Sequence, residues 1–198
     1  MLILLMAIAL LGVLMTLGSL LRLHALPAGL SPLSDPVSAY GISRYRGFYR
    51  AQTLGTALGA AALALGLVVA DVESAVPAVV ALLVLAAARA LISWVPMDGD
   101  GAPRSGTGRA HNLLAFGAFA AASVGGFMTG IAFGATGGLE GASVACTALG
   151  WFMTAASALT LAAPLLSPLG RLFGLFERLI YVGMLAWMVV TAVTLLAR

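Results

Sequence analysis

The chain has 198 residues, of which 62% are hydrophobic and only 9% are charged. A soluble domain carries roughly 25% charged residues, so this chain lacks the polar surface that a water-soluble globule needs. Its formal net charge at pH 7 is +3, and all 10 basic residues are arginine. The composition therefore excludes a soluble protein and indicates that most of the surface faces lipid.

About six apolar stretches are long enough to cross a membrane, since a helical span needs about 20 apolar residues. They lack the period-two alternation of barrel strands, so we expect helices. The first stretch is longer than the apolar core of a secretory signal and has no arginine before it, so we expect it to be retained. The predicted spans are residues 2–21, 51–70, 75–96, 112–134, 142–165 and 179–197. The sequence predicts an all-α, polytopic transmembrane bundle, with residues 1–198 in one domain.

The predicted connections differ in length, and the charge follows the longer ones. Residues 71–74 and 135–141 form short turns, while residues 22–50, 97–111 and 166–178 form long connections at the opposite end of the bundle. The arginines at the long-loop end are Arg22, Arg44, Arg46, Arg50, Arg104, Arg109, Arg171 and Arg178. By the positive-inside rule, we expect the long loops in the cytoplasm and both termini outside, in a cell membrane that we take to be a bacterial inner membrane.

The segment before the second predicted span combines aromatic and basic residues. On a helix, Tyr45, Phe48 and Tyr49 share one face, and Arg46 and Arg50 lie one turn apart. Aromatic rings favour the headgroup zone of a membrane, and arginines there attract anionic lipids. The segment predicts either a general interfacial anchor or a specific pocket for a lipid headgroup.

Other polar residues gather in the long connections and offer candidates for chemistry. Asp98 and His111 are candidates for an acid–base pair or for metal binding; the alternative is a solvated rim with ordinary salt bridges. Asp98-Gly-Asp100 begins like a calcium loop, but Ala102 stands where a third oxygen ligand is needed, so calcium is not predicted. Arg109 is expected to contact an anionic headgroup, as are Tyr45, Arg46, Tyr49 and Arg50. Further members of the polar group are Asp35, Ser38, Glu177 and Arg178.

One charge falls inside a predicted span. Arg89 lies about 10 Å along the third span from its end, if the span is helical. A charge within the membrane is costly and usually faces the interior of the bundle. We expect Arg89 either to extend toward the long-loop side or to pair with Glu177.

Several glycines recur at a spacing of four residues, Gly55 with Gly59 and Gly126 with Gly130 and Gly134. This spacing lets helix backbones approach closely, within the chain or against another subunit.

No HExxH, CxxC or Walker-type motif is present. We expect a non-catalytic accessory or packing subunit or a lipid-associated scaffold, with membrane lipids, including anionic ones, and a larger membrane complex as partners. The alternative is an interfacial enzyme that acts on a lipid or other amphiphile. No nucleic-acid partner is expected, and the sequence leaves the cofactor unknown.

Short motifs in the connections resemble those of one family. They are Asp35-Pro-Val-Ser-Ala-Tyr-Gly41, Val95-Pro-Met-Asp98, Gly108-Arg-Ala-His111 and Phe176-Glu-Arg178. Over nearly its whole length the chain resembles the bacterial and archaeal domain-of-unknown-function family numbered nine hundred and ninety-eight, grouped with the Frag1-like six-helix membrane proteins. The resemblance implies that fold but no reaction, and the matching polar positions are Ser38, Asp98, His111, Glu177 and Arg178. The resemblance also implies basic residues at the end of the bundle opposite the long loops. Either this protein is therefore inverted in the membrane, or its arginines lie at the long-loop end because they bind a ligand.

Overall fold

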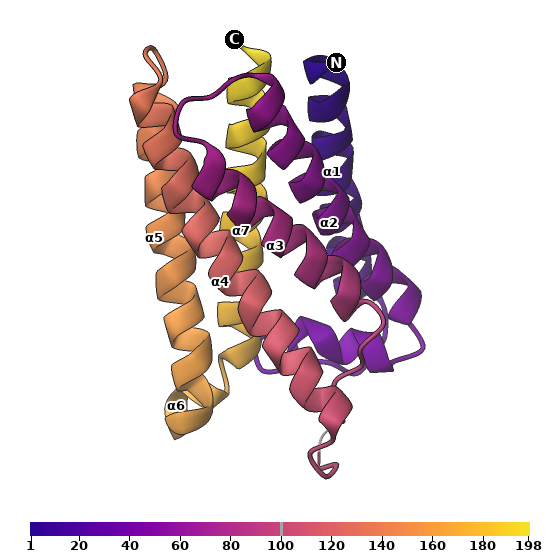
Figure 1. Ribbon diagram of the computed structural model, residues 1–198. Coiled ribbons are helices and arrows are strands. Elements are labelled where there is room, and N and C mark those ends of the chain that lie inside the picture. The colour runs from indigo at the N-terminus through magenta and orange to yellow at the C-terminus, as the bar shows by residue number, and fades with distance from the viewer. Residues whose placement is uncertain (100) are drawn as a thin grey trace.

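The computed structural model describes residues 1–99 and 101–198 (Figure 1). Within these residues the chain forms helices and no strands. The long helices are α1 Leu2–Ala25, α2 Arg46–Val69, α3 Val76–Ile92, α4 Gly106–Ala135, α5 Glu140–Ala162 and α7 Phe173–Leu196. The short helical pieces are η1 Val37–Ile42, η2 Ala163–Leu165 and α6 Ser167–Gly170.

The helices have the length and the surface of membrane spans. Five are long and apolar enough to cross a membrane, and α3 is a shorter apolar helix of 17 residues. Large apolar side chains are exposed on their outer faces, among them Leu14, Leu58, Leu83, Ile131 and Val182. A soluble protein rarely exposes apolar surface on this scale, whereas lipid tails are equally apolar. The predicted all-α, polytopic membrane bundle is confirmed.

The helices form a closed ring. Each long helix packs against the next along the chain from α1 to α5, and α7 closes the ring by packing against both α5 and α1. Both termini and the short turns after α2 and α4 lie at one end of the bundle, and the long connections lie at the other (Figure 1). The polar segments predicted to share one surface therefore do so.

The border between α3 and α4 differs from the predicted one for local reasons. α3 ends at Ile92 rather than at residue 96, because a proline disfavours helical backbone in the residue before it and Pro96 follows shortly. α4 begins at Gly106 rather than at residue 112. Its N-cap is Ser105, whose side-chain oxygen accepts a hydrogen bond from the backbone N–H of Gly108 at 2.9 Å.

Two other helices begin earlier than predicted, and this changes where polar residues lie. α2 begins at Arg46 rather than at residue 51, so Arg46 and Arg50 belong to its first turns. α7 begins at Phe173 rather than at residue 179, so Glu177 and Arg178 lie on a helix and not at its mouth. These side chains therefore have fixed directions relative to the bundle.

Close glycine contacts hold neighbouring helices together inside the chain. A Cβ atom added at Gly12 of α1 would lie 2.5 Å from the carbonyl oxygen of Gly55 of α2. One added at Gly126 of α4 would lie 2.8 Å from the Cα atom of Gly150 of α5. Such close approach requires glycine on both sides, so these predicted glycine faces are used for packing within the bundle.

Candidate functional site

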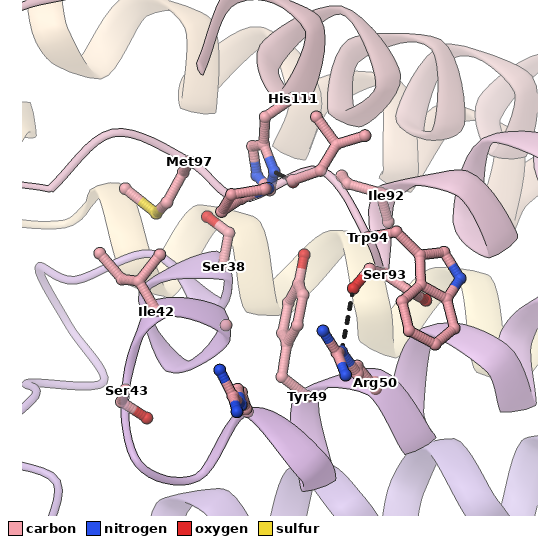
Figure 2. A pocket seen from close by; sticks show the side chains of 14 residues that line it. Ser38, Ile42, Ser43, Tyr49, Arg50, Ile92, Ser93, Trp94, Met97 and His111 are labelled. Atoms are coloured by element: carbon pink, nitrogen blue, oxygen red, sulfur yellow. Dashed lines mark hydrogen bonds between the residues drawn. The ribbon is translucent and has the colours of Figure 1, made fainter. Parts of the chain in front are cut away.

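A polar pocket of about 390 Å³ opens at the long-loop end of the bundle. Its walls come from η1 and the residues after it, from the first turns of α2, and from the end of α3 with the segment that follows; His111 of α4 completes it (Figure 2). The polar and aromatic lining residues are Ser38, Ser43, Arg46, Tyr49, Arg50, Ser93, Trp94 and His111. In the described part of the chain, no aspartate or glutamate lines this pocket.

Two arginines give one wall of the pocket its charge. Arg46 and Arg50 lie one turn apart at the start of α2, where the helix dipole favours acidic rather than basic side chains. The Nε–H of Arg50 donates a hydrogen bond to the carbonyl oxygen of Ser93 at 3.2 Å, and its guanidinium carbon lies 4.5 Å from the centroid of the Trp94 ring. Arg46 is exposed at the pocket edge. This wall is electrostatically complementary to an anion.

The donor and acceptor roles of the two ring nitrogens of His111 follow from its hydrogen bonding. Its ring is only 2% exposed, and its Nδ1 lies 2.7 Å from the carbonyl oxygen of Val95. Because a carbonyl oxygen only accepts hydrogen bonds, Nδ1 must carry a proton. In the neutral ring Nε2 is then a hydrogen-bond acceptor, and within the described protein this buried atom has no hydrogen-bond partner.

Two hydroxyl groups lie at the same end of the pocket as His111. Tyr49 of α2 is 4% exposed, and Figure 2 shows its hydroxyl pointing toward the space between Ser38 and His111. Ser38 belongs to η1 and is half-buried. Three elements thus bring an imidazole and two hydroxyls to the inner end of a pocket whose outer wall is cationic.

Arg89 lies inside the bundle and does not extend to the surface. It is 2% exposed, and its Nη2 donates hydrogen bonds at 2.8 Å both to the side-chain oxygen of Gln52 and to the hydroxyl of Tyr181. Glu177, proposed as an ion-pair partner, instead accepts a hydrogen bond from the backbone N–H of Val37 at 2.6 Å. Among the described residues, the hydrogen-bond partners of Arg89 are therefore neutral, and Glu177 fastens η1 to α7.

Arg178 and Asp35 hold the first long connection in place. Nη1 of Arg178 donates to the carbonyl oxygens of Asp35 at 2.9 Å and of Gly174 at 2.8 Å, and its Nε donates to Nε2 of His24 at 2.6 Å. The Asp35 carboxylate accepts the backbone N–H of Ser31 at 2.7 Å. These side chains join α7, α1 and the connection between α1 and η1, and they lie outside the pocket.

The Asp98 carboxylate forms hydrogen bonds at the start of α4 and does not line the pocket. Its two carboxylate oxygens accept hydrogen bonds from the Ser105 hydroxyl at 2.6 Å and from the Ser105 backbone N–H at 3.0 Å. These bonds lower the pKa of Asp98 below its ordinary value. Gly108 leaves room for this carboxylate, which an added Cβ would strike. Asp100 lies outside the described residues, and within them no group of three or more His, Cys, Asp or Glu could hold a metal.

Two further predicted headgroup contacts lie apart from the pocket lining. Arg109 is exposed on the first turn of α4. Tyr45 is half-buried at the N-cap of α2, where the guanidinium carbon of Arg44 lies 4.7 Å from the centroid of its ring. The structure therefore joins Ser38, Arg46, Tyr49, Arg50 and His111 in one pocket and leaves Tyr45 and Arg109 on the surrounding surface.

The sequence did not identify some of the residues that line the pocket. Ser93 and Trp94 were assigned to the third span, and nothing in their local pattern showed that the helix ends before them. The Val95 carbonyl that fixes the protonated nitrogen of His111 has no sequence signal. Gln52, which binds Arg89 and lies outside the pocket lining, did carry a signal, because an amide inside a span usually faces a polar partner.

A second hollow of about 640 Å³ lies between α4 and α5 near α7. Phe116, Phe119 and Phe173 are among its apolar lining residues. Lipid tails fill grooves of this kind on any helix bundle, so the polar pocket is the stronger candidate for a specific site.

The comparison with known families agrees with the motif resemblance. Residues 7–194 match the family described as "Protein of unknown function (DUF998)". The chain belongs to the DUF998 family. Neither a curated protein nor a solved structure matches it. Membership of DUF998 confirms the predicted family and adds no reaction, so function must be argued from the pocket.

Proposed function

We propose that this integral membrane protein of the DUF998 family binds the anionic headgroup of a membrane amphiphile in the pocket between η1, α2 and the end of α3. The observation that supports this most is that Arg46 and Arg50 line one pocket that no described carboxylate lines. Guanidinium groups form short, charge-assisted hydrogen bonds with phosphate and carboxylate oxygens. An anion bound there would neutralise two basic groups that the start of a helix otherwise disfavours.

The position of the pocket also supports a membrane ligand. It opens at the end of the bundle, beside the ends of spanning helices, where lipid headgroups lie. Trp94 is 63% exposed at its edge, and tryptophan is enriched at this level of a membrane. A ligand anchored by its tail in the surrounding lipid would reach the arginines without leaving the membrane.

A lipid-associated role is better supported than a packing subunit. The glycine faces that would serve a partner subunit contain Gly55 and Gly126, and both already contact neighbouring helices of the same chain. Association with a larger membrane complex is a separate hypothesis. We place the protein in a bacterial inner membrane, with the long loops in the cytoplasm and both termini outside, on the strength of the arginine distribution.

The test is a lipid titration followed by native mass spectrometry, with metal analysis of the same sample. The wild-type protein should retain phosphatidylglycerol in preference to phosphatidylcholine. The double variant Arg46→Gln, Arg50→Gln should lose at least about tenfold in affinity for phosphatidylglycerol, because a hydrogen bond to a charged group contributes about 1.5–3 kcal/mol and about 1.4 kcal/mol is tenfold.

A matched control separates the pocket from general surface charge. Arg104→Gln with Arg109→Gln removes the same charge at the same end of the bundle, from exposed residues outside the pocket lining. This variant should bind phosphatidylglycerol nearly as the wild type does. Equal losses in both double variants, or no wild-type preference for the anionic lipid, would overturn the proposal.

The alternative, an interfacial enzyme, is supported by one observation: His111 lines the pocket, and its Nε2 has no hydrogen-bond partner in the described protein. Its proposed partner Asp98 is hydrogen-bonded to Ser105 instead, so His111 would act without it. If Asp98→Asn and His111→Ala both complement a deletion strain fully, this alternative fails.

A further inference from the structure

We infer that the pocket selects, among anionic amphiphiles, those whose headgroup carries a free hydroxyl group close to the phosphate, as a glycerol headgroup does. This inference rests on the proposed function and specifies its ligand. The arginines would hold the phosphate at the outer wall, and the inner end, formed by His111, Tyr49 and Ser38, would hold the hydroxyl.

The acceptor nitrogen of His111 is the main reason. Nδ1 is hydrogen-bonded to the Val95 carbonyl at 2.7 Å, so Nε2 of this pocket-lining residue is the acceptor, and no group of the described protein donates to it. Buried polar atoms in folded proteins almost always have a partner. A phosphate oxygen cannot bond to this atom of the neutral ring, because an anionic oxygen and a nitrogen lone pair are both acceptors. A hydroxyl group can, since it donates its proton to the nitrogen.

The hydroxyls of Tyr49 and Ser38 can also bind a ligand hydroxyl group. The Tyr49 hydroxyl points toward the space between Ser38 and His111 (Figure 2). Each of these hydroxyls both donates and accepts, so each can bond to the oxygen of a ligand hydroxyl whose proton goes to His111. The pocket volume of about 390 Å³ is within the range of small-molecule sites, roughly 300–1,000 Å³, so one headgroup can reach both ends.

A metal ion is a weaker explanation for the free nitrogen. Among the described residues, His111 is the only His, Cys, Asp or Glu that lines the pocket, and two arginines share the pocket with it. Their charge opposes a cation and favours the anionic ligand already proposed.

The experiment compares phosphatidylglycerol with phosphatidylmethanol of the same acyl chains, since the two have equal charge and differ in the headgroup hydroxyls. Native mass spectra of the full-length protein in mild detergent would give the affinity for each, with phosphatidylcholine as the neutral reference. The wild type should bind phosphatidylglycerol about threefold to tenfold more tightly than phosphatidylmethanol, as expected for one or two neutral hydrogen bonds.

Two variants test the inner end separately. His111→Asn keeps a side-chain N–H for the Val95 carbonyl but lacks the second nitrogen, and Tyr49→Phe removes only a hydroxyl. Each should reduce the affinity for phosphatidylglycerol more than the affinity for phosphatidylmethanol, so the preference for phosphatidylglycerol falls. Because the two changes act on different helices, one variant still tests the inference if the other fails to fold.

The outcomes distinguish this inference from the proposed function. Equal wild-type affinity for phosphatidylglycerol and phosphatidylmethanol, with both above phosphatidylcholine, would overturn hydroxyl selection and leave the anionic pocket standing. A preference unchanged in both variants would also overturn it. No preference for either anionic lipid over phosphatidylcholine would remove both proposals together.

Discussion

Arg89 is a buried cation whose hydrogen-bond partners among the described residues are neutral. The Gln52 side-chain oxygen and the Tyr181 hydroxyl accept its hydrogen bonds, and the Tyr181 ring centroid lies 5.1 Å from its guanidinium carbon. Its Nε–H is buried with no partner in the described protein. A buried charge is strongly destabilising when a partner is removed, so the bundle depends on each acceptor that Arg89 has.

We predict that Tyr181→Phe lowers the free energy of unfolding by about 1–3 kcal/mol, because Arg89 loses one of the acceptors that the described residues give it. The change should be measured by denaturant titration in mixed micelles, followed by tryptophan fluorescence. Tyr45→Phe is the control, since Tyr45 is only half-buried and a change there should stay within about 0.5 kcal/mol. A Tyr181→Phe protein as stable as the wild type would mean that Arg89 finds another acceptor.

Some residues that the sequence groups also lie together in the structure. Arg46, Arg50 and Tyr49 were grouped from their helical spacing, and they do line one pocket with His111. Asp98 was expected to work with His111, but its carboxylate is bonded to Ser105. A cap of this kind depends on where α4 begins, and neighbouring residues alone do not determine that point.

At the level of helices, glycine sets which pairs can approach closely. Gly126 of α4 faces Gly150 of α5, where the nearest backbone atom would lie 2.8 Å from an added Cβ. Backbone atoms cannot rotate away as a flexible side chain can, so the two helices would have to separate. Gly117, on the same helix, has no atom within 4 Å of an added Cβ.

We predict opposite effects of alanine at these two positions. Gly126→Ala should lower the free energy of unfolding by about 1–3 kcal/mol, as overpacking does in well-packed cores. Gly117→Ala should raise it by about 0.5–1 kcal/mol, because alanine is the better helix former. Thermal or denaturant unfolding in the same detergent would measure both, and a loss of stability at Gly117 equal to that at Gly126 would contradict the helix contact.

Helix number and type followed from apolar length, whereas helix ends did not. The run through residue 96 is apolar, yet α3 stops at Ile92 before Pro96. The segment from Arg46 to Arg50 is too polar to be counted as a span, yet it is helical and forms part of α2. Hydropathy measures how strongly a segment prefers lipid to water. The start and end of a helix depend instead on capping residues and on packing against neighbouring elements such as η1.

The whole molecule is a ring of helices with one polar end, and its orientation in the membrane decides which compartment supplies the ligand. The long connections, with most of the arginines, share the end opposite both termini. If that end is cytoplasmic, the pocket faces lipids of the inner leaflet, whose anionic headgroups attract arginine. If it is outside, the positive-inside rule fails because the arginines are there to bind ligands.

We predict that a cysteine at Ala102 is labelled by a membrane-impermeant maleimide only after cells are permeabilised, whereas one at Glu73 is labelled in intact cells. Both positions are exposed. Ala102 lies in the connection between α3 and α4 and Glu73 in the short turn after α2, and these two connections are at opposite ends of the bundle (Figure 1). The native Cys146 is fully buried, so the unmodified protein serves as the unlabelled background. The reverse pattern would place the long loops outside and overturn the orientation. It would leave the headgroup proposal intact, because Arg46 and Arg50 would then have to be explained by what they bind.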